Sequence, residues 1–215
     1  MTRIDDYRLA GGKIAEVRRC YDMLGVLPQM GYYPPMPEVP PILGAMLNRT
    51  PEDLRPGWGT PSEVTGAPGD PEANKALMVR EIEEGWNKGD AAAVMEIFAP
   101  TFVHHDPFWP TITDYETYRQ WAEEYTSPDA PTDMVIGDML VEGDKVLEHW
   151  APGPGVFEVY VVVAITIYRF ADGKVVEGWF TRNVLPLFID QGLLLPLPAT
   201  AVERRTWGQI KSLFK

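Results

Sequence analysis

Three consecutive residues, His104, His105 and Asp106, are the strongest candidates for chemistry in this sequence, and Pro107 follows them. A neutral histidine can accept or donate a proton near pH 7, so His105 beside Asp106 would suit enolisation of a ketone or an ester. The alternative is structural: an Asp-Pro turn ends a strand, and the histidine bonds a backbone group. The sequence leaves both interpretations open.

A metal site at the same residues is less favoured. Neighbouring residues of a strand point to opposite faces, so only His104 and Asp106 could share an ion. The chain holds three histidines and one cysteine, and the sequence shows no second cluster of them. We therefore expect no metal. We also expect no cofactor, because the sequence has neither a glycine-rich dinucleotide motif nor a phosphate-binding loop.

Composition narrows the class of protein further. The 215 residues carry a net charge of -12, which disfavours nucleic acids and anionic membrane surfaces as partners. The longest apolar run, Val159–Ile167, is too short for a membrane span and suits a strand. The first residues lack a secretory signal pattern, and a single cysteine, Cys20, cannot form an intrachain disulfide. We expect a cytoplasmic protein with no nucleic-acid or membrane partner.

The chain repeats part of itself. Residues 7–37 align without a gap on residues 168–198. The identical pairs are Tyr7/Tyr168, Arg8/Arg169, Ala10/Ala171, Gly12/Gly173, Lys13/Lys174, Glu16/Glu177, Leu24/Leu185, Gly31/Gly192, Pro35/Pro196 and Pro37/Pro198. Chance alone would give roughly two identities over such a window. The chain therefore opens with what resembles the tail of one domain and then runs through a complete second one.

These features divide the chain into three parts. Residues 1–38 hold the partial repeat, and residues 39–70 are rich in proline and glycine, as in a linker. Residues 71–215 hold the compact domain. Because an unpaired strand promotes aggregation, we expect the partial repeat to join a sheet of its own chain or of a partner.

The compact domain begins with helices and continues with strands. Apolar residues at helical spacing predict helices over residues 71–86, 91–99 and 114–125. Turn signals and strand-like runs predict strands over residues 102–106, 134–141, 145–150, 156–170 and 174–182. This order is typical of an α+β fold with helices on one face of an antiparallel sheet.

The strand predicted over residues 156–170 has no wholly polar face. One of its faces would carry Val159, Val161, Val163, Ile165 and Ile167. A sheet with one wet face alternates apolar and polar residues, so both faces of this strand must be covered. Helices can cover only one of them. We expect a second subunit on the aliphatic face, which gives a homodimer through the sheet.

Several segments resemble a known family. They are NKALMVREIEEGWNKGDAAAVMEIFAPTFVHHDPF from Asn74, VEGDKV from Val141, IYRFADGKVVEGW from Ile167 and DQGLL from Asp190. In order and spacing they are similar to a SnoaL-like polyketide cyclase domain of the nuclear transport factor 2-like superfamily. The resemblance implies a cone-shaped α+β fold, in which helices pack on the concave face of a curved antiparallel sheet.

The resemblance also implies site residues. In the family, the histidine of a His-Asp-Pro pattern lines the pocket, which points to His105 and Asp106 as catalytic residues. The candidate substrate contacts are His149, Trp109, Trp121, Tyr160, Thr166, Trp179 and Asn183, of which the aromatic residues are candidates as walls of an apolar pocket. His149 could instead be a sheet-face histidine that pairs with a neighbouring carboxylate. Two of the candidates depart from the family, since Thr166 stands where cyclases carry an acid/base aspartate and Asn183 replaces a further aspartate.

Together these features favour a cofactor-independent enzyme of the cyclase or isomerase class. It would act by acid/base chemistry on a small hydrophobic carbonyl compound. The alternative is a non-catalytic ligand-binding or dimerisation module of the same fold, which Thr166 and Asn183 favour.

Overall fold

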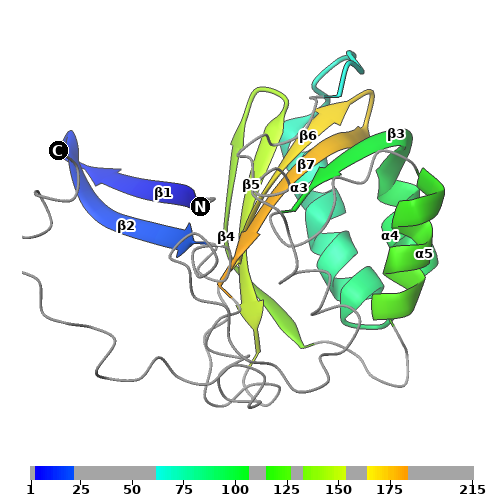
Figure 1. Ribbon diagram of the computed structural model, residues 1–215. Coiled ribbons are helices and arrows are strands. Elements are labelled where there is room, and N and C mark those ends of the chain that lie inside the picture. Colours follow the sequence, from blue (N-terminus) through cyan, green and yellow to red (C-terminus); the bar gives the residue numbers. More distant parts are fainter. Residues whose placement is uncertain (1–2, 22–61, 107–114, 127–132, 154–163, 184–215) are drawn as a thin grey trace, which may run out of the picture.

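The structure is a computed structural model, and it describes residues 3–21, 62–106, 115–126, 133–153 and 164–183. Figure 1 shows a five-stranded sheet with helices on one face and a separate two-stranded hairpin on the other side. No described helix combines the length and the apolar character that crossing a bilayer requires.

The structure describes four helical segments, and two of them begin at a capping aspartate. They are α3 (Pro71–Arg80), the π-helical turn η1 (Glu81–Trp86) that continues it, α4 (Ala91–Ile97) and α5 (Tyr115–Tyr125). At the start of α3, the Asp70 side chain accepts a hydrogen bond from the Ala73 N–H at 2.8 Å. Asp90 caps α4 in the same way, after Gly89 has turned the chain at a φ of 73°.

The sheet has the order β3-β7-β6-β5-β4. Its strands are β3 (Phe98–His105), β4 (Met134–Glu142), β5 (Lys145–Pro152), β6 (Ala164–Ala171) and β7 (Lys174–Arg182). Pairs among β4, β5, β6 and β7 are antiparallel, whereas β3 runs parallel to β7 at the edge. The sheet is therefore mixed, and the prediction of a wholly antiparallel sheet fails at this one pair.

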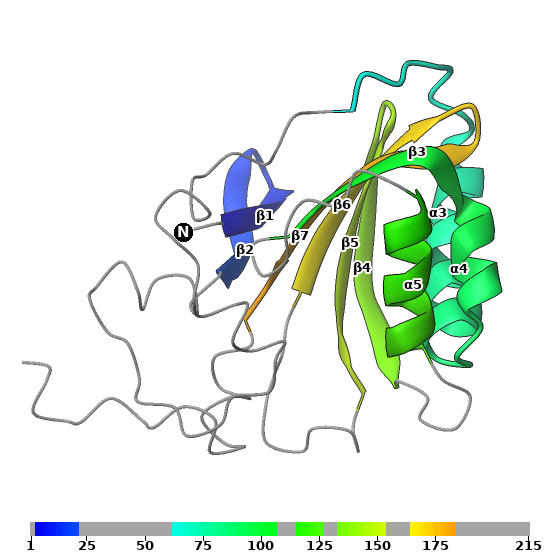
Figure 2. The same ribbon diagram turned by 45° about the vertical axis from the view of Figure 1, so that its right-hand side comes forward.

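The two faces of the sheet have different neighbours, because successive side chains of a strand alternate. The inner face, which the helices cover in Figure 2, includes Val146, Glu148, Thr166, Tyr168 and Phe180. The outer face includes Leu147, His149, Ile165, Ile167 and Trp179.

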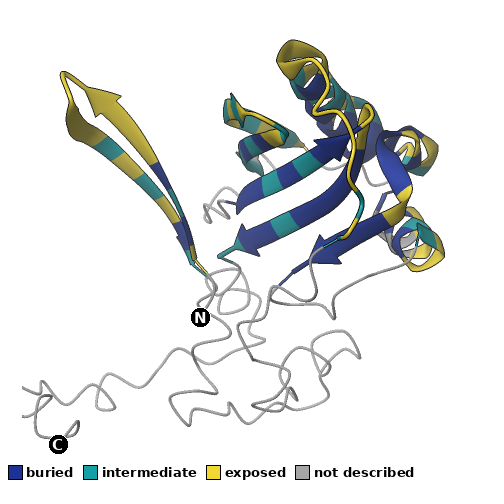
Figure 3. Ribbon diagram, turned by 90° about the horizontal axis from the view of Figure 1, so that it is seen from above, coloured by how far each residue is buried: buried dark blue, intermediate teal, exposed yellow. Residues whose placement is uncertain are grey.

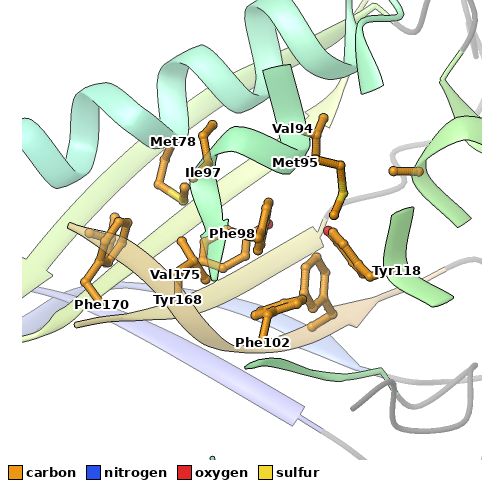
Figure 4. Close-up of a cluster of buried hydrophobic side chains, with 13 residues drawn as sticks. Met78, Val94, Met95, Ile97, Phe98, Phe102, Tyr118, Tyr168, Phe170 and Val175 are labelled. Carbon is orange, nitrogen blue, oxygen red and sulfur yellow. The ribbon is translucent and has the colours of Figure 1, made fainter. Parts of the chain in front are cut away.

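Aromatic and aliphatic side chains fill the space between helices and inner face (Figure 4). Phe98 lies at its centre, with ring centroids 4.6 Å from Phe102 and 4.9 Å from Tyr118. Met78 from α3 and Val94 from α4 are completely buried against it. Burial of this apolar surface fixes the helices to the sheet, and each such side chain contributes roughly 1.5–3 kcal/mol.

A hairpin of β1 (Arg3–Ala10) and β2 (Lys13–Tyr21) lies against the outer face. Ile4 and Cys20, near the open end of the hairpin, form a buried cluster with Ile165. Figure 3 shows the turn end projecting away from the sheet and exposed to solvent. At Ile165, then, the same chain supplies the cover that the sequence analysis assigned to a second subunit.

The predicted α+β fold, with helices packed on one face of the sheet, is confirmed. The strand predicted over residues 174–182 has those bounds in β7. The strand predicted over residues 102–106 begins earlier, at Phe98. Of the strand predicted over residues 156–170, the structure describes only the part from Ala164 onward, so Val159, Val161 and Val163 lie outside the described residues.

Candidate functional site

Two carboxyl groups are buried between η1 and the inner face of the sheet. Glu81 accepts hydrogen bonds from Trp86 Nε1 and from the Tyr168 hydroxyl, both at 3.1 Å. Glu148, which faces Thr166 across the β5–β6 pair, is fully buried. Neither of its carboxyl oxygens has a hydrogen-bond partner among the described residues. Native proteins rarely leave such a group unsatisfied, so Glu148 calls for an explanation beyond folding.

Burial keeps both carboxyl groups protonated at higher pH than usual. Desolvation raises the pKa of Glu81 to about 7, although its bonds from Trp86 and Tyr168 oppose the shift. Desolvation also raises the pKa of Glu148 well above its usual range, and the charge of Glu81 adds to this effect. At least one member of this pair is therefore a neutral acid near neutral pH, able to donate a hydrogen bond.

A second polar group lies on the same face, at the end of β3. His104 Nε2 is 3.6 Å from Asp106 Oδ2, and Arg182 from the end of β7 forms an ion pair with the same carboxylate oxygen. His104 also stacks at a tilt on Phe180, with ring centroids 4.2 Å apart. Burial lowers the pKa of His104, and the Asp106 carboxylate counteracts part of that shift. The imidazole is therefore neutral at pH 7 and able to accept a proton.

Tyr118 on α5 interacts electrostatically with both the Glu81–Glu148 pair and Asp106. Its phenol is fully buried, and burial raises its pKa well above the usual value. The charges of Glu81, Glu148, Asp106 and Arg182 all act on this phenol. The Tyr118 ring lies 5.5 Å from the His104 ring, centroid to centroid, and strand alternation places His104 and Glu148 on the same face, so both pairs belong to the inner side of the sheet.

His105 lies on the opposite side of the sheet. Its Nε2 is 3.0 Å from Glu177 Oε1, and its ring stacks on Trp179. Glu177 also accepts hydrogen bonds from Arg169 Nε at 3.0 Å and from the Ser62 N–H at 3.1 Å. Arg169 in turn donates to the backbone oxygens of Ser62 and Val64. This outer cluster fastens residues 62–64 to the sheet, and within it His105 Nδ1 is buried without a hydrogen-bond partner among the described residues.

The structure therefore separates the residues that the sequence analysis grouped together. Asp106 and Thr166 lie on the inner face, whereas His105, His149 and Trp179 lie on the outer face. The expected pairing of His105 with Asp106 is not what the structure shows, because adjacent residues of β3 point to opposite faces.

The remaining predicted site residues are less completely described. Trp109 and Tyr160 lie outside the described residues, and Trp121 lies in α5 but its side chain is not described. Asn183 directly follows β7 and is partly buried. The Thr166 hydroxyl accepts a hydrogen bond from Trp150 Nε1 at 3.1 Å.

Sequence reasoning missed Glu81 and Glu148, although both leave a signal. Glu81 stands three residues after Met78, within the buried stripe of the first helix. Glu148 stands between Val146 and Trp150 at the spacing of one strand face. A carboxyl group in an apolar stripe is the pattern that could have identified them.

Among the described residues, no group of three or more His, Cys, Asp or Glu side chains could hold a metal ion. The inner face instead offers a protonated carboxyl group of the Glu81–Glu148 pair, the neutral imidazole of His104, and the Asp106 carboxylate paired with Arg182.

Comparison with known proteins assigns part of this chain to a family. The family described as "SnoaL-like domain" matches residues 79–178. No curated protein matches the chain.

Several solved structures are similar, all at low sequence identity. A candidate hydroxylase, AclR from Streptomyces galilaeus, is 22% identical with a TM-score of 0.47, covering 67% of this chain and 96% of its own. A candidate SnoaL-like polyketide cyclase from Jannaschia sp. CCS1 is 20% identical with a TM-score of 0.46, covering 64% and 99%. A candidate ketosteroid isomerase from Kribbella flavida is 18% identical with a TM-score of 0.44, covering 64% and 93%. Likenesses this distant say nothing of activity or ligand. The family match itself identifies residues 79–178 of this chain as a SnoaL-like domain.

Proposed function

We propose that this SnoaL-like domain catalyses proton transfer on a small hydrophobic carbonyl compound, as an isomerase or a cyclase does. The observation that carries the proposal is Glu148: a buried carboxyl group without a hydrogen-bond partner among the described residues, with a raised pKa. A neutral carboxylic acid in an apolar site can donate a hydrogen bond to a substrate carbonyl and stabilise the enolate that forms from it.

His104 is the group that we assign to proton transfer. It lies on the same face as Glu148, it is neutral at pH 7, and Asp106 lies 3.6 Å from its Nε2. In the proposed reaction the imidazole removes a proton from the carbon next to the carbonyl group. Asp106 stabilises the imidazolium, and the proton then returns to a different atom of the enolate. His105 takes no part, because it is bonded to Glu177 on the outer face.

A non-catalytic binding module is the second candidate, and Thr166 favours it. A threonine hydroxyl cannot replace the acid/base aspartate of related cyclases at neutral pH. In this chain the hydroxyl already accepts the hydrogen bond of Trp150. Under this alternative, Glu148 would hold a ligand carbonyl without any proton transfer to carbon.

Exchange of α-protons distinguishes the two candidates without knowledge of the natural substrate. The assay follows deuterium uptake from D₂O by 2-tetralone and by a β,γ-unsaturated steroid ketone, with proton NMR as the readout. We expect uptake above the buffer rate with the wild-type chain. We expect Glu148→Gln to lower the catalysed rate by roughly 100-fold, because the amide stabilises an enolate less well than an acid does.

Matched variants keep this experiment interpretable. Glu116→Gln makes the same chemical change at an exposed position of α5 and should leave the rate unchanged. His104→Gln should abolish exchange, while thermal unfolding reports whether the variant is folded. Ligand binding by calorimetry with no deuterium uptake would support the binding module, and uptake that survives in both Glu148→Gln and His104→Gln would reject the assigned site.

A further inference from the structure

The β1–β2 hairpin has the same local geometry as the β6–β7 hairpin. Gly11 and Gly12 turn the first hairpin at φ values of 59° and 73°, and Asp172 and Gly173 turn the second at 51° and 76°. In both hairpins the register shifts at the corresponding place, between Arg8 and Leu9 in β1 and between the equivalent residues of β6. The repeat found in the sequence is therefore also a repeat of backbone conformation.

The same ion pair crosses both hairpins. Arg8 Nε donates to Glu16 Oε2 at 2.8 Å, and Arg169 Nε donates to Glu177 Oε2 at 3.0 Å. Each pair joins residues directly opposite each other, next to the register shift. The turn, the register shift and the ion pair together identify the β1–β2 hairpin as a structural counterpart of the β6–β7 hairpin.

Two contacts between the first hairpin and the second join equivalent positions. Cys20 Sγ is 3.3 Å from the Thr181 carbonyl oxygen, and residue 181 is the position that aligns with residue 20. Ile4 shares a buried cluster with Ile165, which lies just ahead of the aligned segment at the same offset along the chain. Contact between equivalent residues is the signature of a twofold arrangement, here within a single chain. The hairpin stands where the β6–β7 hairpin of a twin domain would stand.

The exposed face of the hairpin corresponds to the inner face of the sheet. Tyr7, Leu9, Ile14 and Val17 keep 43%, 65%, 59% and 39% of their surface exposed. Their counterparts in β6 and β7 are Tyr168, Phe170, Val175 and Gly178. The first three belong to the core under the helices, and Gly178 packs on Tyr168. The hairpin thus presents a core-forming surface with no described helix over it (Figure 3).

We propose that this face binds the front half of a second SnoaL-like domain, meaning a layer of amphipathic helices on strands that lack their closing hairpin. The partner's helices would cover Leu9 and Ile14 as α3 and α4 cover the core of the described domain. Charge agrees with such a partner. Residues 3–21 carry five basic and three acidic side chains, and Arg3 and Arg19 are the basic residues on the exposed face, so an acidic front half like that of this chain would be complementary. The basic residues are Arg3, Arg8, Lys13, Arg18 and Arg19.

A fusion protein tests the proposal. An additional copy of residues 70–163 of this chain is joined ahead of the full chain, since the front half precedes the hairpin in the described domain. Hydrogen exchange followed by mass spectrometry then reports on the amides of residues 3–21. We expect them to exchange roughly 100-fold more slowly in the fusion than in the unfused chain, because a completed sheet opens less often.

A second fusion carries Leu9→Phe, Val17→Gly and Arg19→Phe, which restore the side chains found at the equivalent positions. Slower exchange in either fusion supports the proposal. Adding Ile14→Asp to that fusion should abolish the slowing, whereas adding Lys13→Glu at the turn should leave it in place. Unchanged exchange in both fusions overturns it. Light scattering supplies a second outcome that overturns it: a dimer of the unfused chain that Leu9→Lys converts to a monomer. The exposed face would then bind a second copy of this chain.

Discussion

The hairpins β1–β2 and β6–β7 share a turn, a register shift and an Arg–Glu pair, yet only one of them is enclosed. Glu177 in β7 is 2% exposed and binds His105, Arg169 and the Ser62 backbone. The side chain of its counterpart Glu16 keeps 40% of its surface exposed and pairs with Arg8 and Arg18. The comparison teaches that short-range sequence sets the conformation of a hairpin, whereas its surroundings decide what its side chains can do.

The tyrosines of the two hairpins show the same contrast. Tyr7 donates a hydrogen bond to Asp5 at 2.7 Å in an exposed setting, where contact with Arg3 keeps the pKa of that aspartate low. Tyr168 donates to Glu81 at 3.1 Å in a buried setting, where desolvation raises the pKa of the glutamate to about 7. Enclosure converts an ordinary carboxylate into a neutral acid, which is the property that the proposed function uses.

Loss of the enclosed glutamate should have the largest effect on stability. Glu177→Ala leaves Arg169 and His105 without their shared partner, and we expect it to lower the free energy of unfolding by about 3–5 kcal/mol. Glu16→Ala removes the counterpart from an exposed pair and should cause no resolvable change. Urea denaturation of both variants measures the difference, and equal losses would contradict the contrast between the hairpins.

The pH dependence of stability should change next most strongly. The pKa of Glu81 is raised on folding, from an ordinary value of 4.5 to about 7. The contribution of protonated Glu81 to the free energy of unfolding is therefore fully present below pH 4.5. It falls as the pH rises towards 7, because the unfolded state loses the proton first. Glu81→Gln should remove this fall, worth roughly 3 kcal/mol between pH 4.5 and 7.5. Denaturation at several pH values checks it, and parallel curves for wild type and variant would refute it.

Removal of the tyrosine hydroxyl should have a smaller effect. Tyr168→Phe deletes the donor to Glu81 and should cost about 1 kcal/mol, since Trp86 still donates to that carboxyl group. It should also raise the pKa of Glu81 further, because this bond favours the ionised form. Tyr7→Phe is the matched control and should change neither quantity. Carbon-13 NMR titration of glutamate-labelled protein follows the pKa.

The two turn glycines should show the smallest contrast. Gly173→Ala places a side chain at a φ of 76° and should lower the stability of the main domain by about 1 kcal/mol. Gly12→Ala makes the same change at a φ of 73° in the projecting hairpin, so the main unfolding transition should move less. Differential scanning calorimetry compares the variants, and an equal shift in both would show that the hairpins unfold as one unit.

Most of the fold could be predicted from the sequence because its signals are local. Asp70, Asp90 and the turn at Gly173 define where elements begin and end, and the structure places them there. The parallel pairing of β3 with β7 could not be predicted, since it joins residues about 75 positions apart in the chain.

The site could be predicted only in part. The alternation rule already placed His104 and Asp106 on one face, but the resemblance favoured His105. Only the pairing of β3 with β7 shows that His105 lies beside Trp179 on the outer face. Glu148 interrupts an apolar strand face in the sequence, but nothing local shows that helices distant in the chain bury it.

The central claim is that the SnoaL-like domain holds a neutral carboxylic acid on its inner face near neutral pH. Infrared difference spectroscopy of the wild-type chain against Glu148→Gln, titrated from pH 5 to pH 9, tests it most directly. The account predicts that the wild type has a carboxylic acid C=O band of Glu148 above pH 6.5, which the variant lacks, while the band of Glu81 is present in both until the pH passes about 7. A spectrum in which every carboxyl group is ionised by pH 6 would contradict it.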